Sequence, residues 1–443
     1  MAVIAIGRAA ALQSCTVLPT ELNSSPRLWR HRRVLLSLFV AAMIAIHGYF
    51  LWRVRDRIAR ADPDFTVYYT AGKMLRQGRG AQLYQAPAQL ATQAEFARDS
   101  DIRRGPLPYI HPPFEALYFL PLTFFPYSQA FVVWSLVNIA LLAGVAALLR
   151  TSLPSLRAIP TWQAVLACLA FFPIFANFHQ GQDAILLLLF LGLGFRALDR
   201  GADFLGGCWL GLGVFKYHLI LPLALILTVW KGRRFLFGFA ATASAGVLIS
   251  LSLVGWKGAL QYPAFAWQVV SNPGLGGIPP RQLPDLWGLL AGWPVSEKMI
   301  PFLRLAAAAG SGAVLLAVAS LRKAVTDPRL FRLSFACAVI AAVLVGFSTN
   351  TYDLSLLIAP LALVENHRLS ESRGQMLWNR SLIVPAIPLL ISPLWFFLWM
   401  RWQRTNLMAL SLLCWLYVIW REVRRLRSQS EQALPSAGLL ANV

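Results

Sequence analysis

Long apolar segments recur along the whole chain, and short polar segments separate them. Many of these segments approach the roughly 20 residues that a helix needs to cross a bilayer. Because lipid offers no hydrogen-bond partner to free backbone groups, such spans must be helical. The sequence therefore predicts an all-α polytopic membrane protein with roughly 11 to 13 spans. The expected spans cover residues 34–52, 129–149, 162–178, 183–198, 204–230, 235–254, 300–321, 331–348, 354–364, 380–399 and 405–420, and a shorter apolar run lies at 114–125.

Polar residues interrupt one of the expected spans, 204–230, at Lys216-Tyr217-His218. We expect two half-spans that meet at this point and return to the side on which they began. A single unbroken span is the alternative, and it would invert the sidedness of everything that follows. The short run 114–125 follows the pair Pro112-Pro113 and fits either a short span or a re-entrant segment.

Basic clusters stand at both ends of the membrane region, in residues 27–33 and 421–427. The positive-inside rule therefore places both termini in the cytoplasm, although the arginines at 53–60 disagree with this orientation. We divide the chain into a cytoplasmic N-terminal segment, a transmembrane domain and a disordered cytoplasmic tail, with two large loops on the outer side. These parts cover residues 1–33, 34–427 and 428–443, and the outer loops cover 53–111 and 255–300.

The net positive charge of the chain is compatible with the interpretation as a membrane protein. The formal net charge is +21, but only 13% of the residues are charged and 57% are hydrophobic. The basic residues flank apolar runs, and none form a stripe interleaved with aromatic residues on a soluble domain. The excess of positive charge thus indicates membrane lipids and not nucleic acid as partner. The five cysteines are scattered and match no metal-binding spacing.

Two carboxylates and two tyrosines lie just beyond the first expected span: Asp62, Asp64, Tyr68 and Tyr69. A carboxylate at a membrane–water boundary stays ionised without the full cost of burial in hydrocarbon. It is also well placed to act on a substrate whose tail is in the bilayer and whose head is in water. An ionisable residue within an apolar run, such as Lys216, is likewise a functional candidate.

Several short motifs occur in an order and spacing that resemble glycosyltransferase family 87, the DUF2029-like membrane mannosyltransferases. The first is Asp-Phe-x-x-Tyr-Tyr-x-Ala-Gly at residues 64–72. The others are Leu83-Tyr84 after Gly78 or Gly80, His111-Pro112-Pro113-Phe114, Trp134 and Asn138, Gly181-Gln182, Gly211 to Lys216, and Tyr352-Asp353-Leu354. The resemblance spans about residues 60–365, which is most of the chain.

This resemblance implies a GT-C fold, a helical bundle in the inner (plasma) membrane with its active site on the periplasmic or extracellular side. It implies a polyprenyl-phosphate-linked donor, an acceptor that is a lipid or a glycan, no cofactor, and a catalytic base that matches Asp64. The sugar expected from the family is a hexose, mannose, and a pentose stays open. The chain departs from the family at Asp183, where Asn is usual, and at Thr349 to Thr351, where His usually precedes Tyr-Asp. We expect no metal requirement.

Each candidate residue also has a plain structural interpretation. Asp64 fits a general base or a helix N-cap, and Asp353 fits a residue that orients a hydroxyl or a cation, or another cap. Lys216 and His218 fit a donor-phosphate site, or a lysine that reaches for the interface. Substrate-binding candidates that could equally be polar loop residues are Tyr68, Tyr69, His111, His179, Gln180, Gln182 and Asp183, with Arg281 as a further phosphate candidate.

Two rival functions remain at this stage. A transporter or lipid flippase also uses polar residues in broken spans, but it often has two matching halves, and the pattern of residues 61–84 does not recur. A non-catalytic scaffold leaves Asp64, Lys216 and Asp353 unexplained. No loop is long enough to fold a nucleotide-binding domain, so a soluble nucleotide sugar is not the expected donor.

Overall fold

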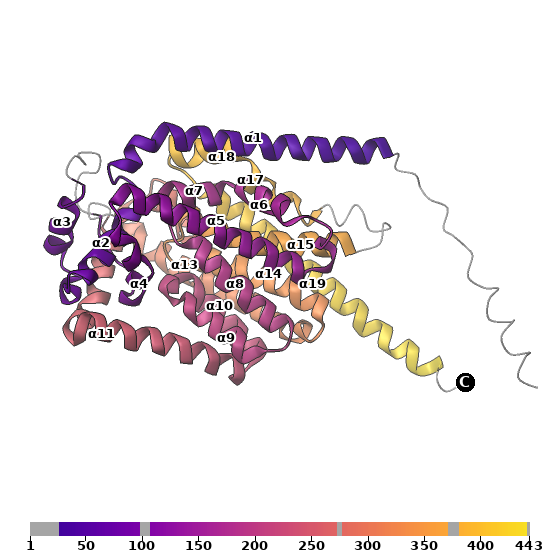
Figure 1. The fold of residues 1–443 in the computed structure, drawn as a ribbon. Coiled ribbons are helices and arrows are strands. Elements are labelled where there is room, and N and C mark those ends of the chain that lie inside the picture. The colour runs from indigo at the N-terminus through magenta and orange to yellow at the C-terminus, as the bar shows by residue number, and fades with distance from the viewer. Residues whose placement is uncertain (1–25, 98–106, 273–276, 371–380, 441–443) are drawn as a thin grey trace, which may run out of the picture. The chain divides into compact units, whose positions relative to one another are not determined.

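The computed structural model describes residues 26–97, 107–272, 277–370 and 381–440, and every regular element within them is helical (Figure 1). The protein is thus an all-α polytopic membrane protein, as predicted. The α-helices are α1 (Pro26–Ala59), α2 (Phe65–Arg76), α3 (Ala86–Ala94), α4 (Ala116–Phe119), α5 (Tyr127–Ser152), α6 (Thr161–Leu169), α7 (Phe172–Gln180), α8 (Ala184–Asp199), α9 (Asp203–Gly211), α10 (Tyr217–Lys231), α11 (Arg233–Ser271), α12 (Leu286–Ala291), α13 (Ile300–Ala319), α14 (Pro328–Val345), α15 (Ile358–Ser370), α17 (Ile387–Leu390), α18 (Ser392–Trp395) and α19 (Leu407–Leu440). Short 3₁₀ segments include η2 (Pro113–Glu115), η3 (Leu120–Phe124), η5 (Leu212–Lys216), η9 (Ser320–Thr326) and η10 (Thr351–Leu357), and a π-helix covers Phe396–Arg401.

The chain divides into two compact units, residues 1–42 and 43–443. The described part of the first unit is the beginning of α1. All candidate site residues belong to the second unit, which the following paragraphs describe.

Six continuous helical segments in the described ranges are long and apolar enough to cross a membrane when Asp203–Lys231 is counted as one, and two bent pairs raise the number to eight. This is fewer than the 11 to 13 spans expected, partly because α8 and α15 have only 16 and 13 residues. The expected spans 162–178 and 380–399 are the bent pairs, with angles of 75° and 68°. Pro173 and Pro393 stand in the first turn after each bend, where proline favours a new helix start.

The interrupted segment 204–230 folds back on itself as α9, η5 and α10. Asp203 and Lys231 form an ion pair of 3.7 Å, so the two ends of the segment meet. A straight helix of this length would separate them by about 40 Å. The backbone leaves helical geometry at Lys216 (φ −105°, ψ 59°), which places this lysine at the bend. The arrangement agrees with two half-spans and not with the single-span alternative.

Two expected loops contain more helix than the sequence suggested. α11 continues past 254 to Ser271, and Gly255 provides the kink with φ 68° and ψ 175°. The region 255–300 is therefore helix for its first third, and not a loop throughout. α1 reaches Ala59, so the arginines at 53–57 extend the first helix. α19 likewise continues to Leu440, where the sequence predicted a disordered tail from residue 428.

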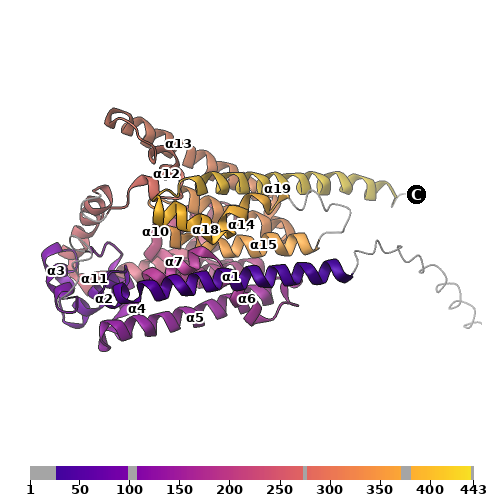
Figure 2. The same cartoon turned by 90° about the horizontal axis from the view of Figure 1, so that it is seen from above.

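Two buried clusters hold the second unit together. The larger one centres on α14, which packs against α10, α15 and α19 (Figure 2). The smaller one is aromatic and joins α2, α4 and the beginning of α5, with Phe65, Tyr68, Phe119 and Trp134 among its members. Because the smaller cluster contains the first turn of α2, it fixes the residue that precedes this helix, Asp64.

Candidate active site

Asp64 occupies the N-cap position of α2, but its side chain makes no capping bond. Its carboxylate Oδ2 accepts a hydrogen bond of 2.8 Å from Gln182 Nε2, and its backbone N–H donates to Gln180 Oε1 at 3.1 Å. The nearby Asp62 lies 3.0 Å from the guanidinium of Arg57. The structure thus joins the loop before α2 to the turn between α7 and α8, 118 residues away.

The turn that carries Gln182 requires a glycine. Gly181 ends α7 with φ 61°, in the left-handed region that favours residues without a Cβ. A Cβ there would lie 2.7 Å from Phe65 Cβ. The indole N–H of Trp134 donates to Gly181 O at 3.0 Å and holds the turn from the side of α5.

The two neighbouring tyrosines of α2 have different surroundings. Tyr68 is buried, stacks on Phe119 at 4.4 Å and donates a hydrogen bond of 2.6 Å to Gln182 Oε1. Tyr69 donates to Phe125 O at 2.8 Å. Consecutive helical residues point about 100° apart, so only one of the two faces the site. Tyr69 is accordingly not among the residues that line the cavity.

Lys216 lies between two buried aspartates. Its ammonium is 3.1 Å from Asp183 Oδ1 and 3.0 Å from Asp353 Oδ1, and only 2% of its side chain is exposed. His218 Nε2 lies 3.7 Å from the other oxygen of Asp353. Asp353 also accepts from the backbone N–H of Asn350 at 2.9 Å as part of a capping box. It therefore serves as both cap and ion-pair partner, where the sequence offered these as alternatives.

A buried carboxyl group at Glu115 completes the charged cluster, and it was not among the residues singled out from the sequence. Glu115 Oε2 accepts from the Tyr109 hydroxyl at 3.1 Å, and Oε1 lies 3.1 Å from His111 Nδ1. Burial raises the pKa of Glu115 to about 7 and lowers the pKa of His111 to about 4. Glu115 begins the apolar run 114–125, so the criterion applied to Lys216 would have found it.

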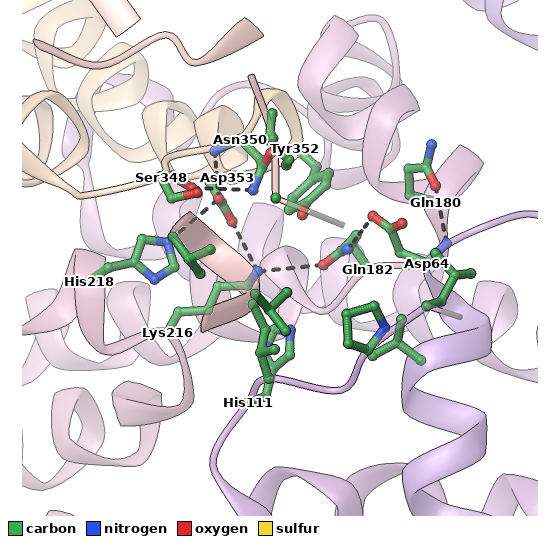
Figure 3. A pocket seen from close by; sticks show the side chains of 18 of the residues that line it. Asp64, His111, Gln180, Gln182, Lys216, His218, Ser348, Asn350, Tyr352 and Asp353 are labelled. Carbon is green, nitrogen blue, oxygen red and sulfur yellow. Dashed lines mark hydrogen bonds and ion pairs between the residues drawn. The ribbon is translucent and has the colours of Figure 1, made fainter. Parts of the chain in front are cut away.

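Eight of the predicted residues line one cavity of about 370 Å³ (Figure 3). They are Asp64, Tyr68, His111, Gln180, Gln182, Lys216, His218 and Asp353. The lining also has an apolar part, formed by Val269, Val270, Ile278, Phe347 and Trp399 among others. Polar lining residues that were not among the predicted site residues include Gln282, Ser348, Asn350 and Tyr352. A cavity of this size and mixed lining suits a substrate with a polar and an apolar part.

Three further predicted residues, besides Tyr69, lie outside this lining. Asp183 is completely buried beside Lys216. The ring of His179 lies 6.2 Å from that of Trp399, next to the cavity. Arg281 is exposed and contacts Gln403 at 3.4 Å, while the adjacent Gln282 reaches the cavity. Within the described ranges, no group of three or more His, Cys, Asp or Glu side chains is arranged to hold a metal ion.

The fold and the cavity define a polytopic membrane protein with a charged site at the ends of its helices. The model of glycosyltransferase family 87 matches residues 109–346, more than half of the 443 residues. The chain therefore belongs to glycosyltransferase family 87, and it is a membrane enzyme that uses a sugar donor and an acceptor. The matched region contains His111, Gln182 and Lys216, and it excludes Asp64 and Asp353. Searches of the curated proteins and of the solved structures found no match.

Proposed function

We propose that this enzyme transfers a hexose, mannose in the first instance, from a polyprenyl-phosphate donor to a lipid or glycan acceptor, with Asp64 as the general base. One observation carries the proposal: the cavity brings the Asp64 carboxylate together with the basic residues Lys216 and His218 and with an apolar wall. A lipid-linked sugar has matching parts, namely a hydroxyl-rich sugar, a phosphate and a hydrocarbon chain. The family membership favours this reading over the transporter and the scaffold.

The transfer reaction needs two kinds of group in the polar lining: a base for the acceptor hydroxyl and a group that stabilises the departing phosphate. The acceptor oxygen attacks the anomeric carbon as Asp64 takes its proton. The bond from that carbon to the phosphate oxygen breaks, and the electron pair leaves with the phosphate. Because the departing polyprenyl phosphate is already anionic, it needs a cation or hydrogen-bond donors and not a general acid.

His218 is the residue that we assign to the donor phosphate. Its side chain is 20% exposed and lines the cavity, whereas Lys216 is 2% exposed and paired with two carboxylates. The positive charge of Lys216 is thus largely compensated inside the protein. We therefore assign to Lys216 the support of Asp353 and His218, a less direct role than the phosphate contact expected from the sequence.

The apolar part of the lining suits the isoprenoid chain next to the phosphate. Val269 and Val270 lie in the last turn of α11, and Phe347 follows α14 with half of its surface exposed. A nucleotide sugar, in contrast, needs polar contacts to a base and a ribose. This contrast supports a lipid donor over GDP-mannose.

The orientation of the protein in the membrane is inferred from the charges at the helix ends that lie away from the cavity. α8 begins beside the site and ends at Asp199, whose carboxylate binds Arg332 at 2.9 and 3.0 Å. Lys231 ends α10, fifteen residues after Lys216, and the basic residues Arg322 and Lys323 lie in η9, which follows α13. The positive-inside rule makes that end cytoplasmic, so we propose that the cavity opens to the non-cytoplasmic face of the inner (plasma) membrane.

The proposal is tested with the purified protein, labelled polyprenyl-phosphate mannose and a panel of lipid and glycan acceptors. The labelled sugar should appear on an acceptor, and GDP-mannose should give no transfer in a system free of enzymes that make the lipid donor. Polyprenyl-phosphate arabinose in parallel decides between hexose and pentose. Turnover with GDP-mannose alone would contradict the lipid donor.

A further inference from the structure

The side-chain amide of Gln182 makes three hydrogen bonds within the protein. Its Nε2 donates to Asp64 Oδ2 at 2.8 Å, and its Oε1 accepts from the Tyr68 hydroxyl at 2.6 Å and from the Lys216 ammonium at 3.5 Å. Only 2% of Gln182 is exposed, although it touches the cavity. Figure 3 shows the amide between the Asp64 carboxylate and the Lys216 ammonium.

These partners leave the amide one orientation. An ammonium only donates, so the atom that faces Lys216 must be the acceptor, Oε1. An ionised carboxylate only accepts, so the atom that faces Asp64 must be the NH₂ group. The amide oxygen has two acceptor sites, and Tyr68 and Lys216 occupy both. Little capacity remains for a sugar hydroxyl to bind at this oxygen.

The partners of the amide are themselves held in place. Tyr68 is packed against Phe119, and the Gly181 carbonyl before Gln182 is bound by Trp134. The backbone of Asp64 is bound by Gln180 from the same turn. The carboxylate of Asp64 is thus oriented by an amide whose position is set by residues of α2, α5 and η5. A base must be held within a few tenths of an ångström of its productive geometry to be efficient.

We propose that Gln182 and Tyr68 are positioning residues that act through Asp64, and not the substrate-binding residues that the sequence suggested. This inference rests on the proposed role of Asp64 as the base. It divides the polar lining of the cavity into residues that position the base and residues, such as His218, that contact the substrate.

The test combines substitutions at 182 and 68 with Asp64→Asn. Gln182→Met keeps the length of the side chain and removes its hydrogen bonds, and Tyr68→Phe removes one oxygen atom. We expect Gln182→Met to lower kcat at least about tenfold, and Tyr68→Phe by less, with KM for donor and acceptor within about twofold of wild type. Gln85→Met, at an exposed glutamine, is the matched control and should leave both constants unchanged.

The decisive comparison uses the Asp64→Asn background. If Gln182 acts only through Asp64, adding Gln182→Met to Asp64→Asn causes no further loss of residual transfer and no change in affinity for the donor. A raised KM with unchanged kcat, or weaker donor binding in the double variant, would overturn the inference in favour of substrate contact. Should Gln182→Met fail to fold, Tyr68→Phe gives the same comparison. A fully active Asp64→Asn protein would refute the proposed function, whereas an inactive one with normal Gln182→Met activity would refute only this inference.

Discussion

Lys216 and Asp183 form an ion pair of 3.1 Å, with 2% and 0% of their side chains exposed. Asp353 contacts the same ammonium from η10 at 3.0 Å. The pair joins the bend between α9 and α10 to the beginning of α8. Taking charges out of water is costly, so each of these groups depends on its partners for compensation. The polar end of the cavity is therefore also a structural element of the fold.

We expect Lys216→Met to destabilise the protein by about 3–5 kcal/mol, because two buried carboxylates lose their cation. The thermal unfolding midpoint of the purified protein in detergent measures this effect. Lys257→Met is the control, since Lys257 is exposed on α11, and it should change the midpoint little. An unchanged midpoint for Lys216→Met would mean that the two aspartates do not need the lysine for stability.

Glu115 predicts a pH dependence of stability. Burial raises its pKa to about 7, whereas a carboxyl in the unfolded chain has a pKa of about 4.3. The folded protein therefore holds the proton more tightly. The stability from this group is fully present below about pH 4.3 and is lost as the pH rises from there through about 7. The neighbouring titratable groups are His111, Asp183, Lys216 and Tyr109.

Glu115→Gln isolates this contribution, because the neutral amide has the same size as the protonated acid. At pH 4 the variant and the wild type should unfold at similar temperatures. At pH 8 the variant should be more stable, by an amount on the order of a few kcal/mol. Unfolding midpoints at both pH values provide the measurement, and a constant difference between the two proteins would contradict a raised pKa for Glu115.

Gly181→Ala tests the turn that carries Gln182. The new methyl group would lie 2.7 Å from Phe65 Cβ, in addition to the strain of a left-handed φ of 61°. Gly201→Ala is the matched control, because its φ is 77° and its Cβ would meet nothing within 4 Å. We expect Gly201→Ala to cost about 1–2 kcal/mol of stability and to keep transfer activity. Gly181→Ala should cost more and should also lower kcat, since Gln182 moves with the turn; equal effects of the two changes would contradict this account.

The residues that meet in the cavity were largely predictable from their places along the chain. Asp64, Gln182, Lys216 and Asp353 each stand at an end or a break of an apolar run. The two half-spans around Lys216 followed from the same pattern. Such reasoning orders segments across a bilayer because burial of polar residues in lipid is costly.

The pairing of the charges was not predictable. Lys216 could have met a donor phosphate, and only the packed structure shows that two aspartates compensate it. Which of Tyr68 and Tyr69 faces the cavity depends on the rotation of α2 about its own axis. The apolar pattern of this 12-residue helix does not determine that rotation. The straight helices of membrane-spanning length are fewer than the expected spans, because bends just before Pro173 and Pro393 divide segments that look continuous in the sequence.

The most direct test of the central claim is the rate of sugar transfer by Asp64→Asn with the polyprenyl-phosphate donor. Asparagine keeps the shape of the side chain and an oxygen that accepts from Gln182 Nε2, so the protein should fold normally. Loss of the base should lower transfer by at least about a hundredfold. Asp62→Asn, two residues earlier and paired with Arg57, should retain transfer. Near-wild-type turnover by Asp64→Asn would contradict the account and move the base to another residue.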